Sequence, residues 1–216
     1  MGKMLIAVVT CHARRNQAVA QRFTWARDQE NVRFFLGGGE PEHSKEVILP
    51  VDDSYTGLPA KVKAVMGWAR ENGYDSVLKI DDDVYLVIDR ILRAGFFHHD
   101  YVGNFRARNG SYPHDYASGF AYYLSGRAVG IIADADLTED TMEDRWVGSV
   151  LSNPLLRISA YDEKRFACTY PCGVDSAKYL WGSPIGKSHL AFAQYPAKEF
   201  AALDYWYRRI HAVQYA

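Results

Sequence analysis

The sequence predicts an α/β fold with a mostly parallel central sheet flanked by helices. Short apolar runs of strand length alternate with helical patterns through the first half of the chain, which is the order typical of such a sheet. The 216 residues are enough for one well-buried core and hardly enough for two. The composition, 48% hydrophobic and 24% charged, is that of a globular protein. We therefore expect a single domain spanning residues 1–216.

The expected strands of the first half are apolar runs, each followed by a break or a helical pattern. They are Met4 to Thr10, Val32 to Leu36, Val47 to Val51 and Ser76 to Ile80. A first helix is expected from about Ala18 to Arg27, and Gly37 to Gly39 end the second strand. A second helix is predicted by apolar residues at helical spacing, and Asn72-Gly73 ends it. These residues are Leu58, Val62, Val65, Met66 and Ala69.

The second half of the chain is less regular. Tyr101 to Phe105 and Phe120 to Leu124 are expected as strands, and Glu143 to Leu151 as a helix. Ala197 to Ala212 is expected as a final helix rich in aromatic and basic residues. No internal repeat, low-complexity segment or linker interrupts the sequence.

Charge and cysteine content exclude several classes of protein. The formal net charge of −1 argues against a protein that binds nucleic acid through bulk charge. The run from Met4 to Val9 is too short for a signal-peptide core or a membrane span. Three cysteines leave one unpaired in any disulfide scheme, and Cys168 and Cys172 lack the second pair of a zinc site. We therefore expect a cytoplasmic chain without membrane contact.

Three adjacent acids, Asp81, Asp82 and Asp83, follow the strand that ends at Ile80. Ligands of open α/β sheets bind beyond the carboxyl ends of the strands, so a site is expected here. Adjacent carboxylates repel one another, and a hard cation such as Mg²⁺ or Mn²⁺ with diphosphate oxygens would neutralise them. The sequence therefore predicts a metal-diphosphate site. A solvated acidic turn is the alternative, and Lys79 could instead balance the acids.

Motifs along most of the chain resemble glycosyltransferase family 31, which contains β-1,3-galactosyl- and N-acetylglucosaminyltransferases and Fringe. The matching blocks share the family's order and approximate spacing. They are Arg15 with Arg22-Phe23-Thr24-Trp25, Phe34-Phe35-Leu36-Gly37, Asp53-Ser54-Tyr55 with Leu58 and Lys61, Lys79 to Tyr85, Tyr112-Pro113 with Tyr116 to Gly119 and Tyr122 to Ser125, and Glu143 to Gly148. The chain departs from the pattern at Gly57 and Pro59, by one residue inserted before Tyr116, and at Phe120, where the family favours a small residue.

The resemblance implies a GT-A fold and a reaction. A Rossmann-like half over about residues 1–100 would bind a nucleotide sugar, and residues 101–216 would bind the acceptor. The chain would be an inverting, metal-dependent hexosyltransferase that moves a sugar from a UDP-sugar to a hydroxyl acceptor, with a glycan favoured. Mn²⁺ or Mg²⁺ would be the cofactor.

The resemblance also implies a role for each matching residue. Asp81 and Asp83 would bind the metal with His189 as a further ligand, Asp82 would bind the ribose or sugar hydroxyls, and Asp144 would be the general base. The donor would contact Thr10, Arg15, Arg22, Tyr55 and Lys61. The acceptor would contact Tyr116, Gly119, Phe120, Glu143 and Trp146.

Structural roles stay open for several of these residues. Thr141 to Asp144 fits a capping box, in which the last residue would satisfy the helix start. Glu143 would also suit the positive end of a helix dipole. Arg22 and Lys61 could lie on solvated helix faces, and a single histidine such as His189 is usually structural.

Three other functions remain open at this stage. A viral or bacterial enzyme that glycosylates hydroxymethylated DNA bases would use Arg106, Arg108 and Trp206 to Arg209 on phosphates or on a flipped base. A metal-dependent phosphoesterase would use the acidic triplet. A non-catalytic module would bind a nucleotide sugar without transfer. Salt-sensitive binding to a hydroxymethylated duplex tests the first of these.

Overall fold

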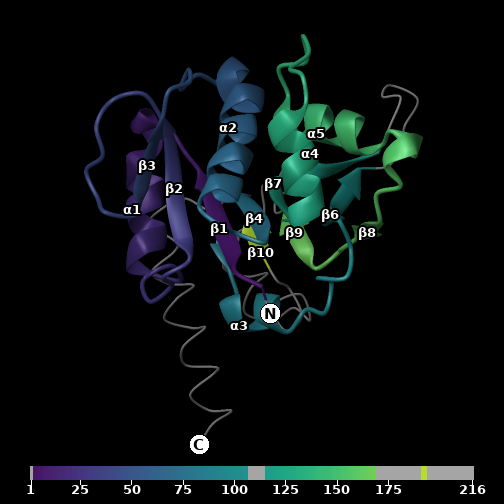
Figure 1. Cartoon of the computed structure of the whole chain (residues 1–216). Coiled ribbons are helices and arrows are strands. Elements are labelled where there is room, and N and C mark those ends of the chain that lie inside the picture. Colours follow the sequence, from purple (N-terminus) through teal and green to yellow (C-terminus); the bar gives the residue numbers. More distant parts are fainter. Residues whose placement is uncertain (1, 107–114, 169–190, 194–216) are drawn as a thin grey trace, which may run out of the picture.

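The computed structural model describes residues 2–106, 115–168 and 191–193. Its centre is a seven-stranded sheet in the order β3-β2-β1-β4-β7-β6-β8, beside a three-stranded sheet in the order β5-β10-β9 (Figure 1). The strands of the large sheet are β1 Met4–Val9, β2 Val32–Gly37, β3 Glu46–Leu49, β4 Ser76–Asp81, β6 Tyr101–Arg106, β7 Tyr116–Ser125 and β8 Ala160–Asp162. The strands of the small sheet are β5 Tyr85–Leu86, β9 Phe166–Cys168 and β10 Ala191–Ala193.

The large sheet is mostly parallel, which confirms the predicted fold class. Only β7 runs antiparallel to its neighbours β4 and β6, and the other four pairs are parallel. The α-helices are α1 Arg15–Phe23, α2 Leu58–Glu71, α3 Ile88–Leu92, α4 Gly126–Asp134 and α5 Glu143–Leu151. The 3₁₀ helices are η1 His12–Arg14, η2 Tyr55–Gly57 and η3 Pro154–Leu156.

Helices cover both faces of the sheet, so its central strands are apolar on both sides. In β1, Leu5 and Val9 face the core formed with α2, α4 and α5, whereas Ile6 and Val8 face the core formed with α1, α3 and β5. Figure 1 shows α2, α4 and α5 together on the first of these faces. The uninterrupted apolar run of the first strand therefore follows from burial on two faces. In the described part of the chain, no helix has the length and apolar character needed to cross a bilayer.

Several element boundaries differ from those predicted. The first helix spans Arg15–Phe23 rather than 18–27, because Thr24 leaves the helical conformation and its hydroxyl bonds the carbonyl of Ala20. The seventh strand begins at Tyr116, four residues before the expected start. Helix α4 was not expected, since its glycines obscure the apolar pattern, although Ser125 caps it through Ala128 N–H. The predicted final helix, 197–212, lies outside the described residues.

Candidate active site

A pocket of about 270 Å³ opens at the carboxyl ends of β1 and β4. These strands are parallel neighbours, with Val9 beside Asp81, so the chain that follows each of them reaches the same edge of the sheet. The pocket lining combines the end of β1, the start of α2 and the acidic triplet. It comprises Val9, Thr10, Cys11, Arg14, Asp53, Ser54, Tyr55, Leu58, Lys61, Asp81, Asp82 and Asp83. The predicted position of the site, beyond the fourth strand, thus coincides with a pocket.

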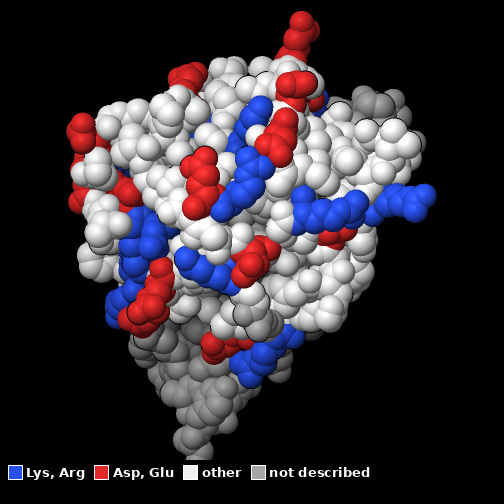
Figure 2. All heavy atoms as spheres, viewed as in Figure 1, with Lys and Arg blue, Asp and Glu red and all other residues white. Residues whose placement is uncertain are grey.

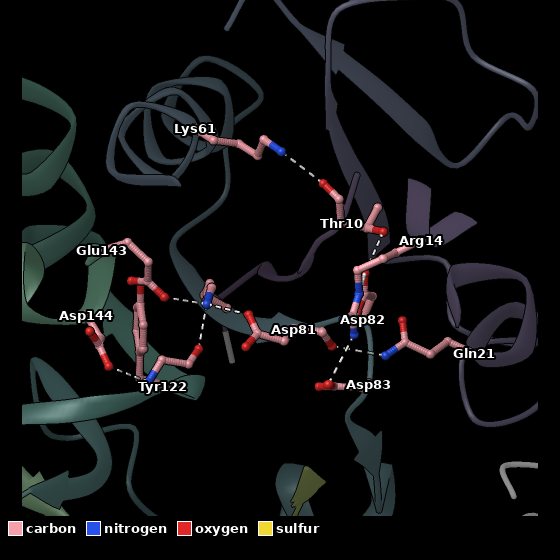
Figure 3. Close-up of polar contacts among 12 residues, drawn as sticks. Thr10, Arg14, Gln21, Lys61, Asp81, Asp82, Asp83, Tyr122, Glu143 and Asp144 are labelled. Carbon is pink, nitrogen blue, oxygen red and sulfur yellow. Dashed lines mark hydrogen bonds and ion pairs between the residues drawn. The ribbon is translucent and has the colours of Figure 1, made fainter. Parts of the chain in front are cut away.

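The three acids of the triplet have different partners (Figure 3). Asp82 is buried, where it accepts a hydrogen bond from Thr10 Oγ1 at 2.8 Å, and its two oxygens share the proton of Arg14 Nε at 2.8 and 3.0 Å. Asp83 accepts from Arg14 Nη2 at 3.1 Å, and Asp81 Oδ1 accepts from Lys79 Nζ at 2.7 Å. Lys79 therefore does pair with the triplet. The side chains of Asp81 and Asp83 remain 41% and 20% exposed, and both line the pocket.

The electrostatics of the triplet favour an additional cation. Burial, together with the charges of Asp81 and Asp82, raises the pKa of Asp83 to about 6 against the opposing effect of Arg14. Burial also raises the pKa of Asp82, although Arg14 and Thr10 donate to its carboxylate. The arginine is thus insufficient to bring these carboxyls to their ordinary pKa.

Gln21 supports the turn that carries the acids. It is fully buried on α1, and its Nε2 donates to the carbonyls of Asp81 at 3.1 Å and Val84 at 2.9 Å. Sequence reasoning missed this contact. The signal available was a glutamine on the face of the first helix that carries the buried Ala18.

Lys61 and Asp53 form the wall of the pocket opposite the acids. Lys61 is buried rather than on a solvated helix face, and its Nζ donates to Thr10 O at 3.0 Å and Asp53 Oδ1 at 2.6 Å. Burial alone would raise the pKa of Asp53, but Lys61 and the N–H groups of His12 and Gly37 outweigh burial and lower the pKa. Tyr55 stands at this wall with 67% of its surface exposed.

Arg15 and Arg22, which were expected to bind the donor diphosphate, lie elsewhere. Arg15 Nη2 donates to Glu46 Oε2 at 3.1 Å, and Arg22 Nη1 donates to Glu46 Oε1 at 2.8 Å. Arg15 also contacts Glu42, and neither arginine lines the pocket. The guanidinium beside the acids belongs to Arg14, which precedes the helix. The solvated-face alternative for Arg22 is wrong, because its side chain is only 14% exposed.

The acceptor-side candidates meet the acids through Lys79. Its Nζ bonds Gly119 O and Glu143 Oε1, both at 2.5 Å, and the N–H of Gly119 donates to Asp144 Oδ2 at 3.1 Å (Figure 3). Burial raises the pKa of Glu143 to about 7 against the opposing effect of Lys79. Burial also raises the pKa of Asp144. The start of α5 therefore places two carboxyls of unusual pKa beside the acidic turn.

The capping box that was the alternative for Thr141 to Asp144 does not form at the start of α5. The N-cap is Met142, which makes no side-chain cap bond, and Thr141 precedes it. Asp144 does accept from Arg145 N–H at 2.8 Å, so it satisfies one amide of the first turn as well as that of Gly119.

Two predicted acceptor residues belong to the core. Trp146 is fully buried, and its Nε1 donates to Asp136 O at 3.1 Å, so it packs against α2 and α4 rather than facing an acceptor. Phe120 is 7% exposed and packs in the core on the α1 side of the sheet. Tyr116 lies half-buried at the start of β7, with its Cβ close to Gly148.

Several predicted residues lie outside the described part of the chain. They are His189, Cys172, Arg108, Tyr112-Pro113 and Trp206 to Arg209. Within residues 2–106, 115–168 and 191–193, no three His, Cys, Asp or Glu side chains converge as a metal-ligand set. On the face shown in Figure 2, acidic and basic side chains are interspersed and form no broad basic stripe.

Comparison with known proteins supports the fold. No protein-family profile matches the chain, and no curated protein matches it. Among solved structures, the glycosyltransferase GlyE of Streptococcus pneumoniae TIGR4 is similar, with a TM-score of 0.51 and 10% identity over 91% of this chain and 55% of that chain. A glycosyltransferase involved in glycosylation of the major capsid of PBCV-1 aligns with a TM-score of 0.48 and 14% identity, over 91% of this chain and 97% of that one. The similarity to GlyE and the order of strands show a GT-A-like glycosyltransferase fold, and the chain spans about half the length of GlyE.

Proposed function

We propose that this chain is an inverting, divalent-metal-dependent glycosyltransferase, similar to family 31, that transfers a sugar from a UDP-sugar to a hydroxyl acceptor. A glycan is the favoured acceptor. One observation carries the proposal: at the carboxyl end of β4, a pocket lined by Asp81 and Asp83 is linked to Asp144 on α5 through the buried Lys79 and the Gly119 peptide. Transfer needs such a pair of sites, one for the leaving phosphate and one for the incoming hydroxyl.

The residues of the pocket fit a metal that takes most of its ligands from phosphate and water. Asp81 and Asp83 each have one carboxylate oxygen bonded to a cation of the protein, while none of the described residues donates a hydrogen bond to the other oxygen. Mg²⁺ is commonly bound by one or two carboxylates together with substrate phosphates. His189 remains a proposed further ligand.

Besides the metal, the reaction needs a cation of the protein for the diphosphate and a base for the hydroxyl, and Arg14 and Asp144 would supply them. A bound divalent cation would stabilise the charge on the leaving diphosphate. Arg14, about half exposed at the pocket, can pair with phosphate oxygens through its planar guanidinium. Asp144 would accept the proton of the attacking hydroxyl, and its raised pKa makes it a better base than an exposed aspartate. Direct attack from the side opposite the leaving group inverts the anomeric carbon.

Screening UDP-sugars with Mn²⁺ tests this proposal. We expect slow release of UDP from one donor, loss of that release with a chelator, and a decrease of about 100-fold or more in Asp83→Ala. Asp134→Ala, which removes an exposed aspartate of α4, is the matched control and should retain wild-type turnover.

Equal turnover by Asp83→Ala and wild type would remove the metal assignment. Hydrolysis of a phosphodiester without any sugar donor would favour a phosphoesterase instead. Binding of UDP-sugar without transfer or hydrolysis across a broad acceptor panel, including hydroxymethylated DNA, would indicate a non-catalytic module.

A further inference from the structure

Lys79 is a buried cation that joins three elements of the site. It is 1% exposed, and its Nζ donates to Asp81 on β4 at 2.7 Å, to Gly119 O on β7 at 2.5 Å and to Glu143 on α5 at 2.5 Å. An ammonium group has three protons, so these contacts use all of them. Lys79 does not line the pocket, and it can act only through the groups that it contacts.

The Gly119 peptide extends this connection to Asp144. Its carbonyl accepts from Lys79, and its N–H donates to Asp144 Oδ2 at 3.1 Å. Glu143 is fixed at both oxygens, because Oε1 accepts from Lys79 and Oε2 accepts from Tyr122 OH at 2.9 Å. One chain of contacts thus runs from the acidic turn to the start of α5 (Figure 3).

We propose that Lys79 is a positioning residue that sets the separation between Asp81 on the donor side and Asp144 on the acceptor side. This inference rests on the proposed function. Its physical basis is that a displacement of about 1 Å between reacting groups can cost about 100-fold in rate. The three contacts of a buried ammonium restrict such displacement across a boundary between strands and a helix.

A purely structural role makes a different prediction. Lys79 could serve only to neutralise Glu143, since loss of one partner from a buried ion pair destabilises a protein strongly. In that case the double variant Lys79→Met/Glu143→Gln, which removes both charges, would regain the free energy of unfolding that Lys79→Met alone loses. Its kcat would equal that of Glu143→Gln alone. If Lys79 positions the site, the double variant recovers stability but not rate, because Asp81 and Gly119 O still lack their donor.

The experiment compares the double variant with Glu143→Gln in the full chain, using Mn²⁺ and the UDP-sugar that the wild type turns over. We expect kcat about 100-fold lower in the double variant, with the donor KM within about threefold. Hydrogen exchange of the Gly119 amide should be about 10-fold faster in the double variant, because its bond to Asp144 is less restrained. Tyr101→Phe is the control and should keep the wild-type kcat, because it removes only the oxygen that accepts a buried hydrogen bond from the N–H of Ala117, on the same strand as Gly119.

Equal kcat and equal Gly119 exchange in the two variants, with an active wild type, would overturn the positioning role and leave the proposed function intact. Absence of UDP-sugar turnover by the wild type would overturn the proposed function, and the positioning role with it. Lys79→Arg gives a further check. Its kcat should lie between those of the double variant and the wild type, because the guanidinium places a hydrogen-bond donor at the same position.

Discussion

Gly119 connects the acidic turn to the start of α5, because its carbonyl accepts from Lys79 and its N–H donates to Asp144. A Cβ added there would lie 2.8 Å from Glu143 Oε1 and 3.4 Å from Asp144 Oδ2. The Glu143 carboxylate cannot move away easily, because Lys79 and Tyr122 bind its two oxygens. Only glycine therefore fits at this position without displacing Glu143 or Asp144.

Gly119→Ala should consequently reduce kcat by about 10- to 100-fold while changing UDP binding little. Overpacking should also lower the free energy of unfolding by about 1–3 kcal/mol. Steady-state kinetics and urea denaturation measure the two effects. The matched control is Gly130→Ala in α4, where an added Cβ meets no atom within 4 Å and should stabilise the helix by about 1 kcal/mol. Wild-type kcat in Gly119→Ala would contradict the tight geometry.

At the scale of elements, Glu46 joins α1 to the edge of the sheet. Its side chain is fully buried on β3 and accepts from both Arg15 and Arg22 of α1. Burial alone would raise the pKa of Glu46, but the N–H of Glu42 and the guanidinium of Arg22 outweigh it and lower the pKa. A carboxyl with a lowered pKa binds fewer protons in the folded state, so it stabilises the fold above its unfolded pKa.

Glu46→Gln should therefore lower the free energy of unfolding at pH 7 by about 3 kcal/mol, because two partly buried guanidinium groups lose the buried carboxylate that they share. The difference in free energy of unfolding between the wild type and Glu46→Gln should be largest above the pKa that Glu46 has in the unfolded chain. It should disappear as the pH falls through the lower pKa that Glu46 has in the folded protein. Urea denaturation between pH 3 and pH 7 measures it. Arg70→Ala, which breaks an exposed pair with Asp134, should cost less than about 1 kcal/mol. If Glu46→Gln remained equally destabilised below the folded-state pKa of Glu46, the explanation by ion pairs would be wrong.

The arginines illustrate what the sequence could and could not predict at this scale. Arg15 and Arg22 are seven residues apart, so on a helix they share one face and meet the same partner. That partner, Glu46, belongs to a neighbouring strand, and no local pattern pairs it with them. Arg14 lies in the turn before the helix, where its direction depends on how the chain leaves β1. The motif therefore predicted arginines around the first helix but not which of them reaches the acids.

At the scale of the whole molecule, the sequence predicted more of the first half than of the second. Strands β1, β2 and β4 are apolar runs buried on both faces, and their length and the breaks that follow them identify them. The short strands β5, β8 and β10 depend on pairing with distant segments, which no local pattern encodes. Lys79 was recognisable as a cation inside a buried strand, whereas its contacts with Gly119 and Glu143 required the packing of α5 on β7.

The central claim is that the acids at the end of β4 bind a metal-nucleotide complex within reach of Asp144. Crystals of the full chain grown with Mn²⁺ and UDP, with data collected at the manganese absorption edge, test it most directly. We predict an anomalous peak between the UDP diphosphate and the carboxylates of Asp81 and Asp83, in the pocket that Lys61 and Tyr55 line. A nucleotide bound elsewhere, with no manganese at these carboxylates, would contradict the account.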